Sequence, residues 1–162
     1  MKISTISFKG MPPNYSVIDK FVSRSAQPKI EDFNWLKERG VTDVVNFRTM
    51  IKAAIDFDEQ TVVEELGMRY HSIPSVTKAP TDTNIKSFLN IINNIVKDNG
   101  KAHIHCMAGA DRTGMYSFIY KMLNGIGNLS ENKTEWLVMG HNNVRYPDLM
   151  NWTEDFVKNF HK

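Results

Sequence analysis

Residues 105–114 read HCMAGADRTG, and this stretch contains the only cysteine in the chain of 162 residues. A lone cysteine is often just a small buried apolar side chain. Here, however, it is followed by glycine at the third position and arginine at the sixth, and a second glycine closes the stretch. This combination indicates a chemical role for Cys106.

The elements predicted on either side place this stretch between a strand and a helix. Residues 101–105 follow the Asn99-Gly100 turn signal and read as a strand, and residues 113–124 read as a helix that ends before Gly125. A loop that enters a helix presents free backbone N–H groups and the positive end of the helix dipole. The position therefore favours the binding of an anion.

The loop residues extend this prediction. Gly109 and Gly114 are expected to let the chain curl tightly, so that the amides of residues 107–112 point inward as an anion nest. The residues of that segment are Met107, Ala108, Gly109, Ala110, Asp111 and Arg112. The planar guanidinium of Arg112 suits two oxygens of one phosphate group. The predicted ligand is a phosphoryl group.

The same surroundings act on the thiol. A free thiol has a pKa of about 8.5, which a helix N-terminus, inward amides and a guanidinium lower by several units. Cys106 is therefore expected to be ionised and to act as an in-line nucleophile. His105 is expected to fix the loop through a hydrogen bond to the backbone, and Thr113 to donate a hydrogen bond to the sulfur.

Hydrophobic periodicity alternates between strand and helix along the whole chain, which predicts a single α/β domain over residues 1–162. The predicted strands cover residues 3–8, 21–25, 41–47, 68–73 and 101–105. The predicted helices cover residues 30–39, a segment around 62–66, residues 83–98, 113–124 and about 130–141, and a last segment from 147. The strand at residues 101–105 is expected to lie inside the sheet.

Composition excludes several classes. The formal net charge of +2 gives no basic surface for nucleic acid, and no stretch approaches the length of a membrane span. A single cysteine cannot form an internal disulfide, and no Cys and His cluster suggests a metal site. The N-terminal residues lack the apolar core of a signal peptide. The sequence thus predicts a cytoplasmic protein without nucleic-acid partners, metal or other cofactor.

The stretch HCMAGADRTG resembles H-C-x-x-G-x-x-R-[ST]-G, the signature of the Cys-dependent protein tyrosine phosphatase superfamily, and looks like its compact dual-specificity branch. Three further segments resemble small bacterial and fungal members in the same order: SRSAQP at 23–28, VTDVVNFR at 41–48 and GMRYHSIP at 67–74. The likeness covers about residues 20–125. It implies a central, mixed but mostly parallel sheet of four to five strands flanked by helices.

The resemblance also implies a reaction, the metal-free hydrolysis of a phosphomonoester in two steps. Cys106 would attack phosphorus to form a cysteinyl-phosphate, while Arg112 and the loop amides hold the phosphate oxygens. Water would then release phosphate. The substrate would be a phosphoprotein with phosphotyrosine or another phosphorylated residue, or a small phosphomonoester such as an inositol phosphate or phosphoinositide.

The general acid is where the chain departs from the best-known members, which carry an aspartate on a loop about thirty residues before the cysteine. Here that region reads PSVTKAPTD and has no acid before Asp82. Asp111 is the favoured candidate, as in myotubularin-like loops that carry an aspartate before the arginine. Asp111 could instead brace Arg112, and Asp82 sits in an ordinary helix-capping cluster.

Other polar residues have weaker assignments. Arg24 and Arg48 end strands at the expected active edge of the sheet, where a structural role is at least as common as a functional one. His71 and His103 are expected to be satisfied residues of strands. His141 and Arg145 are candidates for the rim of the site.

Two other classes of function remain as alternatives. A phosphate-binding pseudoenzyme would recognise phosphorylated partners without hydrolysis, and both Cys106 and Arg112 argue against it. A sulfurtransferase or arsenate reductase also uses cysteine and arginine, but reductases of that kind place the cysteine near the N-terminus and need further cysteines.

Overall fold

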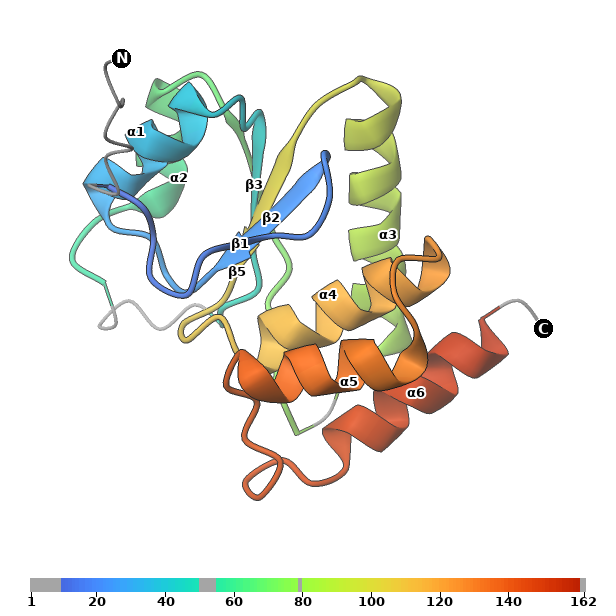
Figure 1. Ribbon diagram of the computed structural model, residues 1–162. Helices are drawn as coiled ribbons and strands as arrows, with labels where there is room; N and C mark the ends of the chain where they lie inside the picture. Colours follow the sequence, from blue (N-terminus) through green and yellow to red (C-terminus); the bar gives the residue numbers. More distant parts are fainter. Residues whose placement is uncertain (1–9, 50–54, 79, 161–162) are drawn as a thin grey trace, which may run out of the picture.

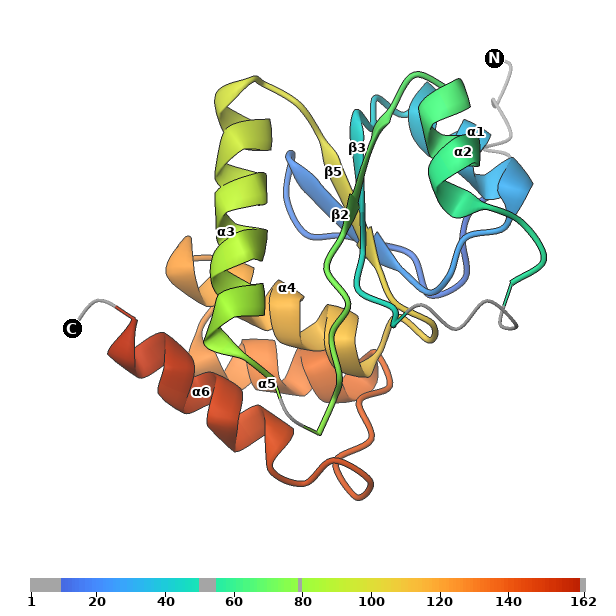
Figure 2. The same cartoon turned by 180° about the vertical axis from the view of Figure 1, so that it is seen from behind.

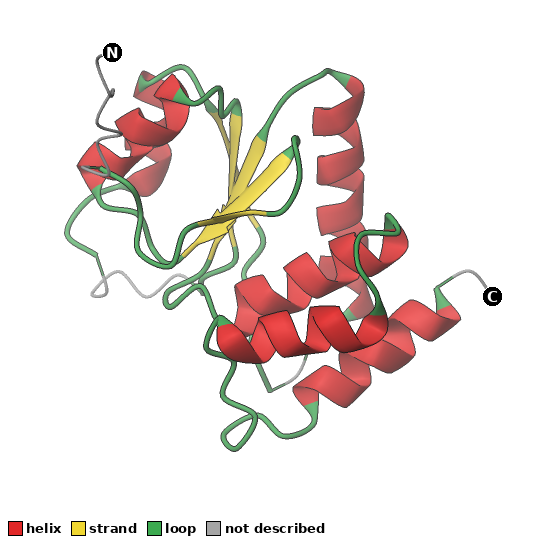
Figure 3. Cartoon of the chain, viewed as in Figure 1, coloured by secondary structure: helices red, strands yellow, loops and turns green. Residues whose placement is uncertain are grey.

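The computed structural model describes residues 10–49, 55–78 and 80–160. Helices pack on both faces of a central sheet (Figure 1; Figure 3, strands in yellow). The described strands are β1 (Ser16–Val17), β2 (Val22–Ser25), β3 (Asp43–Asn46), β4 (Arg69–Ser72) and β5 (Ala102–His105). The described helices are α1 (Ile30–Glu38), α2 (Glu59–Glu65), α3 (Asp82–Lys97), α4 (Asp111–Leu123), α5 (Leu129–Val138) and α6 (Leu149–Asn159).

The strand order in the sheet is β1-β2-β5-β3-β4. The strands β2, β5, β3 and β4 are parallel, and only the short β1 runs antiparallel to its neighbour. The strand that leads into Cys106 therefore lies at the centre of the sheet, as the sequence predicted. The α/β class and the mixed, mostly parallel sheet are confirmed.

Two hydrophobic clusters hold the layers together. The helices α1 and α2 cover one face of the sheet through residues such as Phe33 and Val63, which pack with Val44 of β3. The helices α3, α4, α5 and α6 lie on the other side (Figure 2), where Phe88 and Ile104 belong to the larger cluster. Neighbouring residues of β3 face opposite clusters because side chains alternate along a strand.

The helix boundaries follow local signals in the sequence. The helix α1 ends before Gly40 and α2 before Gly67, and both glycines have positive φ angles that other residues rarely adopt. The side chain of Thr81 caps α3 by accepting a hydrogen bond from the amide of Asn84. The predicted stops and this predicted capping cluster are confirmed.

The differences from the predicted elements are local. The antiparallel strand β1 has only two residues and was not predicted. The helix α4 begins at Asp111, two residues before the predicted start, so Asp111 and Arg112 belong to its first turn. The predicted strand at residues 3–8 lies outside the described residues. Within the described residues, no helix has the length and apolar character needed to cross a membrane.

The position of α3 suggests a stability test. Phe88 is fully buried and lies edge-on to the rings of Phe47 and Tyr116, at centroid distances of 5.6 and 4.9 Å. Phe88→Ala should lower the free energy of unfolding by about 3–5 kcal/mol, because the side chain leaves a cavity in the larger cluster. Urea unfolding measures this loss. Leu137→Ala, at a side chain that is 46% exposed, is the control and should cost less than about 1 kcal/mol. Equal losses would contradict the packing described.

Candidate active site

The sequence motif forms a loop at the carboxyl end of the central strand. We call residues 106–112 the Cys loop: it leaves β5 at Cys106 and enters α4 at Asp111. The neighbouring strands β2 and β3 are parallel to β5, so the segments that follow them meet at the same edge of the sheet. Ligands of open α/β sheets bind at this edge.

The Cys loop is tied from outside by hydrogen bonds to its carbonyl oxygens. The segment around β2 supplies the donors. The backbone N–H of Gln27 donates a 2.9 Å hydrogen bond to the carbonyl oxygen of Met107. The side-chain amide of Asn14 donates to the carbonyl oxygens of Ala108 and Gly109, at 3.3 and 3.4 Å. Arg24 Nη2 also donates to the carbonyl oxygen of Gly109, at 2.7 Å. Three consecutive carbonyl groups of the loop therefore point toward the segment around β2.

This outward arrangement directs the amides of the loop. In a trans peptide the N–H points away from the C=O of the same unit, and the described residues contain no cis peptide. The N–H groups of residues 108, 109 and 110 must therefore point away from the tethering segment. This orientation agrees with the predicted anion nest.

Only one of the two loop glycines serves the curl. Gly109 has φ +71°, and a Cβ at this position would lie 2.5 Å from the amide nitrogen of Ala26. Gly114 has a different function from the one predicted: it lies inside α4, where a Cβ would lie 2.2 Å from the Trp136 ring. Gly114 therefore lets α5 pack closely against α4.

A cavity of about 620 Å³ opens above the loop. It is lined by Cys106 together with Asp111 and Arg112, although the cysteine is itself only 2% exposed. Two further cations, Lys78 and Arg145, come from loops on other elements. The cavity thus brings together a buried sulfur and three cationic side chains, and Arg145, a predicted rim candidate, lines this cavity.

The Arg112 side chain is positioned by the loop after β4. Its Nη1 donates a long hydrogen bond of 3.4 Å to the carbonyl of Ser75. Ser75 is in turn buried, and its hydroxyl lies 2.5 Å from the hydroxyl of Tyr116. Arg112 is therefore oriented over the cavity by a neutral group, which leaves its charge for an anionic ligand.

The His105 ring links the loop to α2. Its Nδ1 lies 3.1 Å from the carbonyl oxygen of Cys106, and its Nε2 lies 2.8 Å from Glu59 Oε2. Both the imidazole and the carboxyl group are buried. The predicted contact of His105 with the backbone is present, and Glu59 is a partner that sequence reasoning missed.

The predicted hydrogen bond from Thr113 to the sulfur is not formed. The Thr113 hydroxyl is fully buried and has no hydrogen-bonding partner among the described residues. Thr113 lies in the first turn of α4, which begins at Asp111.

Asp111 lines the cavity and is held by a segment distant in sequence. Its Oδ1 lies 2.7 Å from Nδ1 of the buried His141 ring and accepts a 2.9 Å hydrogen bond from the amide of Asn142. Burial acts to raise the pKa of the Asp111 carboxyl, but these hydrogen bonds outweigh it and hold the pKa below its ordinary value. The hydrogen bonds that hold Asp111 thus come from His141 and Asn142, and the positive charge of Arg112 also contributes to its lowered pKa. His141 lies behind the site, not on its rim.

Asp82, the other candidate acid, occupies the first turn of α3. It is exposed, and it is not among the residues that line the cavity around Cys106. The structure brings Asp111 into the site and leaves Asp82 in the capping cluster.

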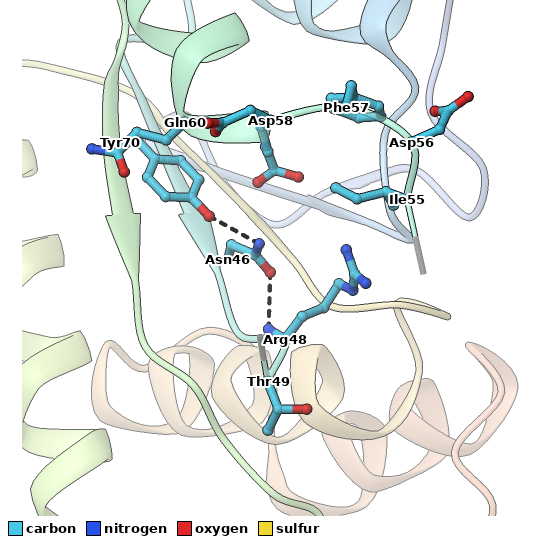
Figure 4. Close-up of a pocket in the computed structure, with 10 residues that line it drawn as sticks. Asn46, Arg48, Thr49, Ile55, Asp56, Phe57, Asp58, Gln60 and Tyr70 are labelled. Carbon is cyan, nitrogen blue, oxygen red and sulfur yellow. Dashed lines mark hydrogen bonds between the residues drawn. The ribbon is translucent and has the colours of Figure 1, made fainter. Parts of the chain in front are cut away.

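A second cavity of about 560 Å³ adjoins the first, because Thr49 lines both. In Figure 4 the guanidinium of Arg48 points up toward Ile55 and Phe57, while Asn46 joins the Tyr70 hydroxyl to the backbone of Arg48. Arg48 Nη1 also donates to Gln27 Oε1 (2.8 Å). Arg48 thus borders the site without reaching the cavity around Cys106.

The two strand histidines have their predicted structural roles. The buried His103 ring lies within 2.8 Å of the hydroxyls of Ser23 and Ser25. His71 lies 2.8 Å from Asp43, which also accepts two hydrogen bonds from Arg69. Within the described residues, no group of three or more His, Cys, Asp or Glu side chains is arranged to hold a metal ion.

The chain matches the family model Tc-R-P, described as "Polymorphic toxin system, DSP-PTPase phosphatase", over residues 20–125. No curated protein matches the chain. Many solved structures share the fold, and three of them serve as examples. The DUF442 protein of Shewanella putrefaciens has a TM-score of 0.77 at 20% identity, with 96% of each chain covered.

The other two structures are slightly less similar. The core catalytic domain of the PP-IP phosphatase SIW14 from S. cerevisiae has a TM-score of 0.70 at 18% identity, with 92% of this chain and 86% of that chain covered. TpbA from P. aeruginosa, in complex with pTyr, has a TM-score of 0.68 at 20% identity, with 90% and 83% covered.

The curl of the Cys loop gives a direct test. Gly109→Ala adds a methyl group against the backbone of Ala26 and should weaken the binding of inorganic phosphate about tenfold or more, measured by isothermal titration calorimetry. Gly125→Ala is the matched control: its φ is +67°, but no atom lies within 4 Å of the added carbon. Both variants should lose roughly 1 kcal/mol of stability from backbone strain, and Gly109→Ala should lose more because its methyl group also clashes with the backbone of Ala26. Equal phosphate affinities would show that the curl does not form the anion site.

Proposed function

Since the chain belongs to the DSP-PTPase phosphatase family of polymorphic toxin systems, we propose that it hydrolyses phosphomonoesters through a cysteinyl-phosphate on Cys106. One observation carries this proposal: the buried thiol and Arg112 line the same cavity. The carbonyl groups of the Cys loop are tied to the segment around β2, so its backbone N–H groups point away from that segment. A bound phosphate would accept hydrogen bonds from the amides and from the guanidinium fork.

In the first step the Cys106 thiolate attacks phosphorus in line with the ester oxygen. The S–P bond forms as the P–O bond to the leaving group breaks, and the leaving oxygen takes one proton from a general acid. Arg112 and the loop amides stabilise the charge on the three remaining phosphoryl oxygens. The imidazole of His105, held between Glu59 and the Cys106 carbonyl, keeps the nucleophile in place.

In the second step water attacks the phosphorus of the cysteinyl-phosphate. The S–P bond breaks and the electron pair returns to sulfur, while the carboxylate formed in the first step takes a proton from the water. Inorganic phosphate leaves and the thiolate is restored. The same carboxyl group thus acts as acid and then as base.

Asp111 is the proposed general acid because its carboxyl group lines the cavity with Cys106, whereas Asp82 does not. Its lowered pKa means that the protonated form is scarce at neutral pH. A bound phosphate dianion beside the carboxyl group would favour its protonation, since two like charges repel at short distance. The arrangement therefore suits catalysis on the acidic side of neutrality.

The proposed substrate is a phosphoprotein of the tyrosine or dual-specificity type, in line with the presence of pTyr in the TpbA structure. A second candidate is an inositol phosphate, and SIW14 carries the name of a PP-IP phosphatase. Lys78 and Arg145 favour this second candidate, because they add positive charge to the rim although the variable positions of the Cys loop are uncharged. A pseudoenzyme is disfavoured by the presence of both Cys106 and Arg112.

The roles of the nucleophile and the guanidinium are separable. In the presence of EDTA the wild-type protein should hydrolyse para-nitrophenyl phosphate. Cys106→Ser should lower kcat by about 10⁴-fold or more and keep phosphate binding. Arg112→Ala should lower both kcat and phosphate affinity, by about 10²–10³-fold in kcat. Arg112→Lys keeps the charge without the fork and should recover only part of the loss. Full activity of the serine variant would reject the mechanism.

The role of Asp111 is tested by changing the leaving group. Asp111→Asn should slow the hydrolysis of alkyl phosphates about 10²-fold or more, and that of activated aryl esters less than about tenfold, because a good leaving group barely needs a proton. Because the Asp111 pKa is held below its ordinary value, and so well below neutrality, the protonated fraction grows as pH falls from 7 toward that pKa, and wild-type turnover of alkyl esters should rise with it. The asparagine variant should lose this rise.

The control for Asp111 is Asp82→Asn, which should leave both classes of substrate unaffected. Equal losses on aryl and alkyl esters in Asp111→Asn would reject the general-acid role. A loss that depends on the leaving group in Asp82→Asn would assign the role to Asp82.

A further inference from the structure

The strand β2 places a fully buried guanidinium behind the Cys loop. Arg24 is 1% exposed, so it does not reach solvent in the cavity. Arginine is almost never fully buried unless its charge is paired, because removal of a cation from water is costly. The partners of Arg24 therefore decide what this residue does.

Within the described residues, the pairing of Arg24 is incomplete. Nη2 donates to the neutral carbonyl of Gly109 at 2.7 Å, and Nε has no hydrogen-bonding partner. The nearest carboxylate oxygen is Glu135 Oε1, which lies 3.9 Å from Nη1. Glu135 is also engaged by Lys121, and its side chain is 31% exposed. The positive charge of Arg24 is thus only partly compensated by Glu135.

The register of the sheet directs Arg24 toward Cys106. The strands β2 and β5 are parallel, with Arg24 opposite Ile104. Opposed residues share a face of the sheet, and the residue two positions further on shares it too. Cys106 is two positions beyond Ile104, and both belong to the larger hydrophobic cluster. Arg24 and Cys106 therefore lie on the same side of the sheet.

The electrostatics agree with this placement. Burial lowers the pKa of the Arg24 guanidinium, and the negative charges of Glu135 and of the Cys106 thiolate oppose that shift. The same Coulomb attraction acts in the other direction, from the guanidinium on an anion at Cys106.

We propose that Arg24 is a positioning residue of the site, which fixes the carbonyl of Gly109 and stabilises the Cys106 thiolate from inside the protein. Its action differs from that of Arg112, which faces the cavity and meets the substrate. This inference rests on the proposed function, because it assumes that Cys106 is the nucleophile. The effect of Arg24 on the ionisation of Cys106 can nevertheless be measured without substrate turnover.

Several other charged or titratable groups line the cavity with Cys106 or contact its backbone. They are His105 at the end of β5, Asp111 and Arg112 in the first turn of α4, Lys78 after β4 and Arg145 before α6. A pH profile of the wild-type protein reports all of them together. Variants of Arg24 and of Glu135 change the charge behind the loop alone.

The test measures the rate at which iodoacetamide alkylates the protein as a function of pH. Cys106 is the only cysteine in the chain, so the rate reports its thiolate directly. Arg24→Met keeps the length of the side chain and removes the charge, and the midpoint of the profile should rise by about one pH unit or more. Arg24→Lys keeps the charge and should restore most of the wild-type midpoint.

Glu135→Gln supplies the opposite change. It removes the carboxylate that partly neutralises Arg24, so the midpoint should fall below that of the wild-type protein. A nonspecific disturbance of packing would not shift the midpoints in opposite directions. Because Glu135 is partly exposed, this variant also tests the proposal if Arg24→Met does not fold.

An unchanged midpoint in a folded Arg24→Met, or an unchanged or raised midpoint in Glu135→Gln, would overturn the proposal. Failure of the proposed function looks different. In that case the wild-type protein would not hydrolyse para-nitrophenyl phosphate, while the shifts in alkylation would still be observed.

Discussion

The candidate site depends on hydrogen bonds that the Cys loop accepts on its outer side. The carbonyls of residues 107–109 are held by Asn14, Arg24 and Gln27, and the planarity of the peptide then turns the following amides away from that segment. A loop that binds an anion through backbone groups needs such support, because unsupported amides would relax toward water. The segment around β2 is therefore as important to the site as the cysteine motif.

The central position of β5 follows from the same constraint. Because β2 and β3 flank β5 in parallel, the segments after them approach the loop from both sides. The segment after β2 brings Gln27 to the loop, and the segment after β3 leads to Arg48 and to the cavity in Figure 4. Helix α4 then extends from the loop with its amino end toward the cavity, and Gly114 lets α5 pack close to it. Sheet, loop and helices thus form one support for a buried thiol.

Much of this arrangement was predictable from local patterns. The run of β-branched residues before Arg48, the apolar stripe of α3 and the glycines at the helix ends specify the elements, because each signal acts within a few residues. The contacts between distant residues were not predictable. Asn14 meets a carbonyl 94 residues away, and His141 meets Asp111 after the turn that follows α5. No local signal marks such pairs, and the same limit explains why Gly114 was assigned to the loop rather than to helix packing.

The central claim is that Cys106 carries the phosphoryl group during turnover. The most direct measurement is mass spectrometry of the protein after rapid denaturation during the hydrolysis of an aryl phosphate. The account predicts a transient adduct with the mass of one phosphoryl group on the peptide that contains Cys106, and no such adduct in Cys106→Ser. Steady hydrolysis with no adduct on that peptide, or with an adduct on another residue, would contradict it.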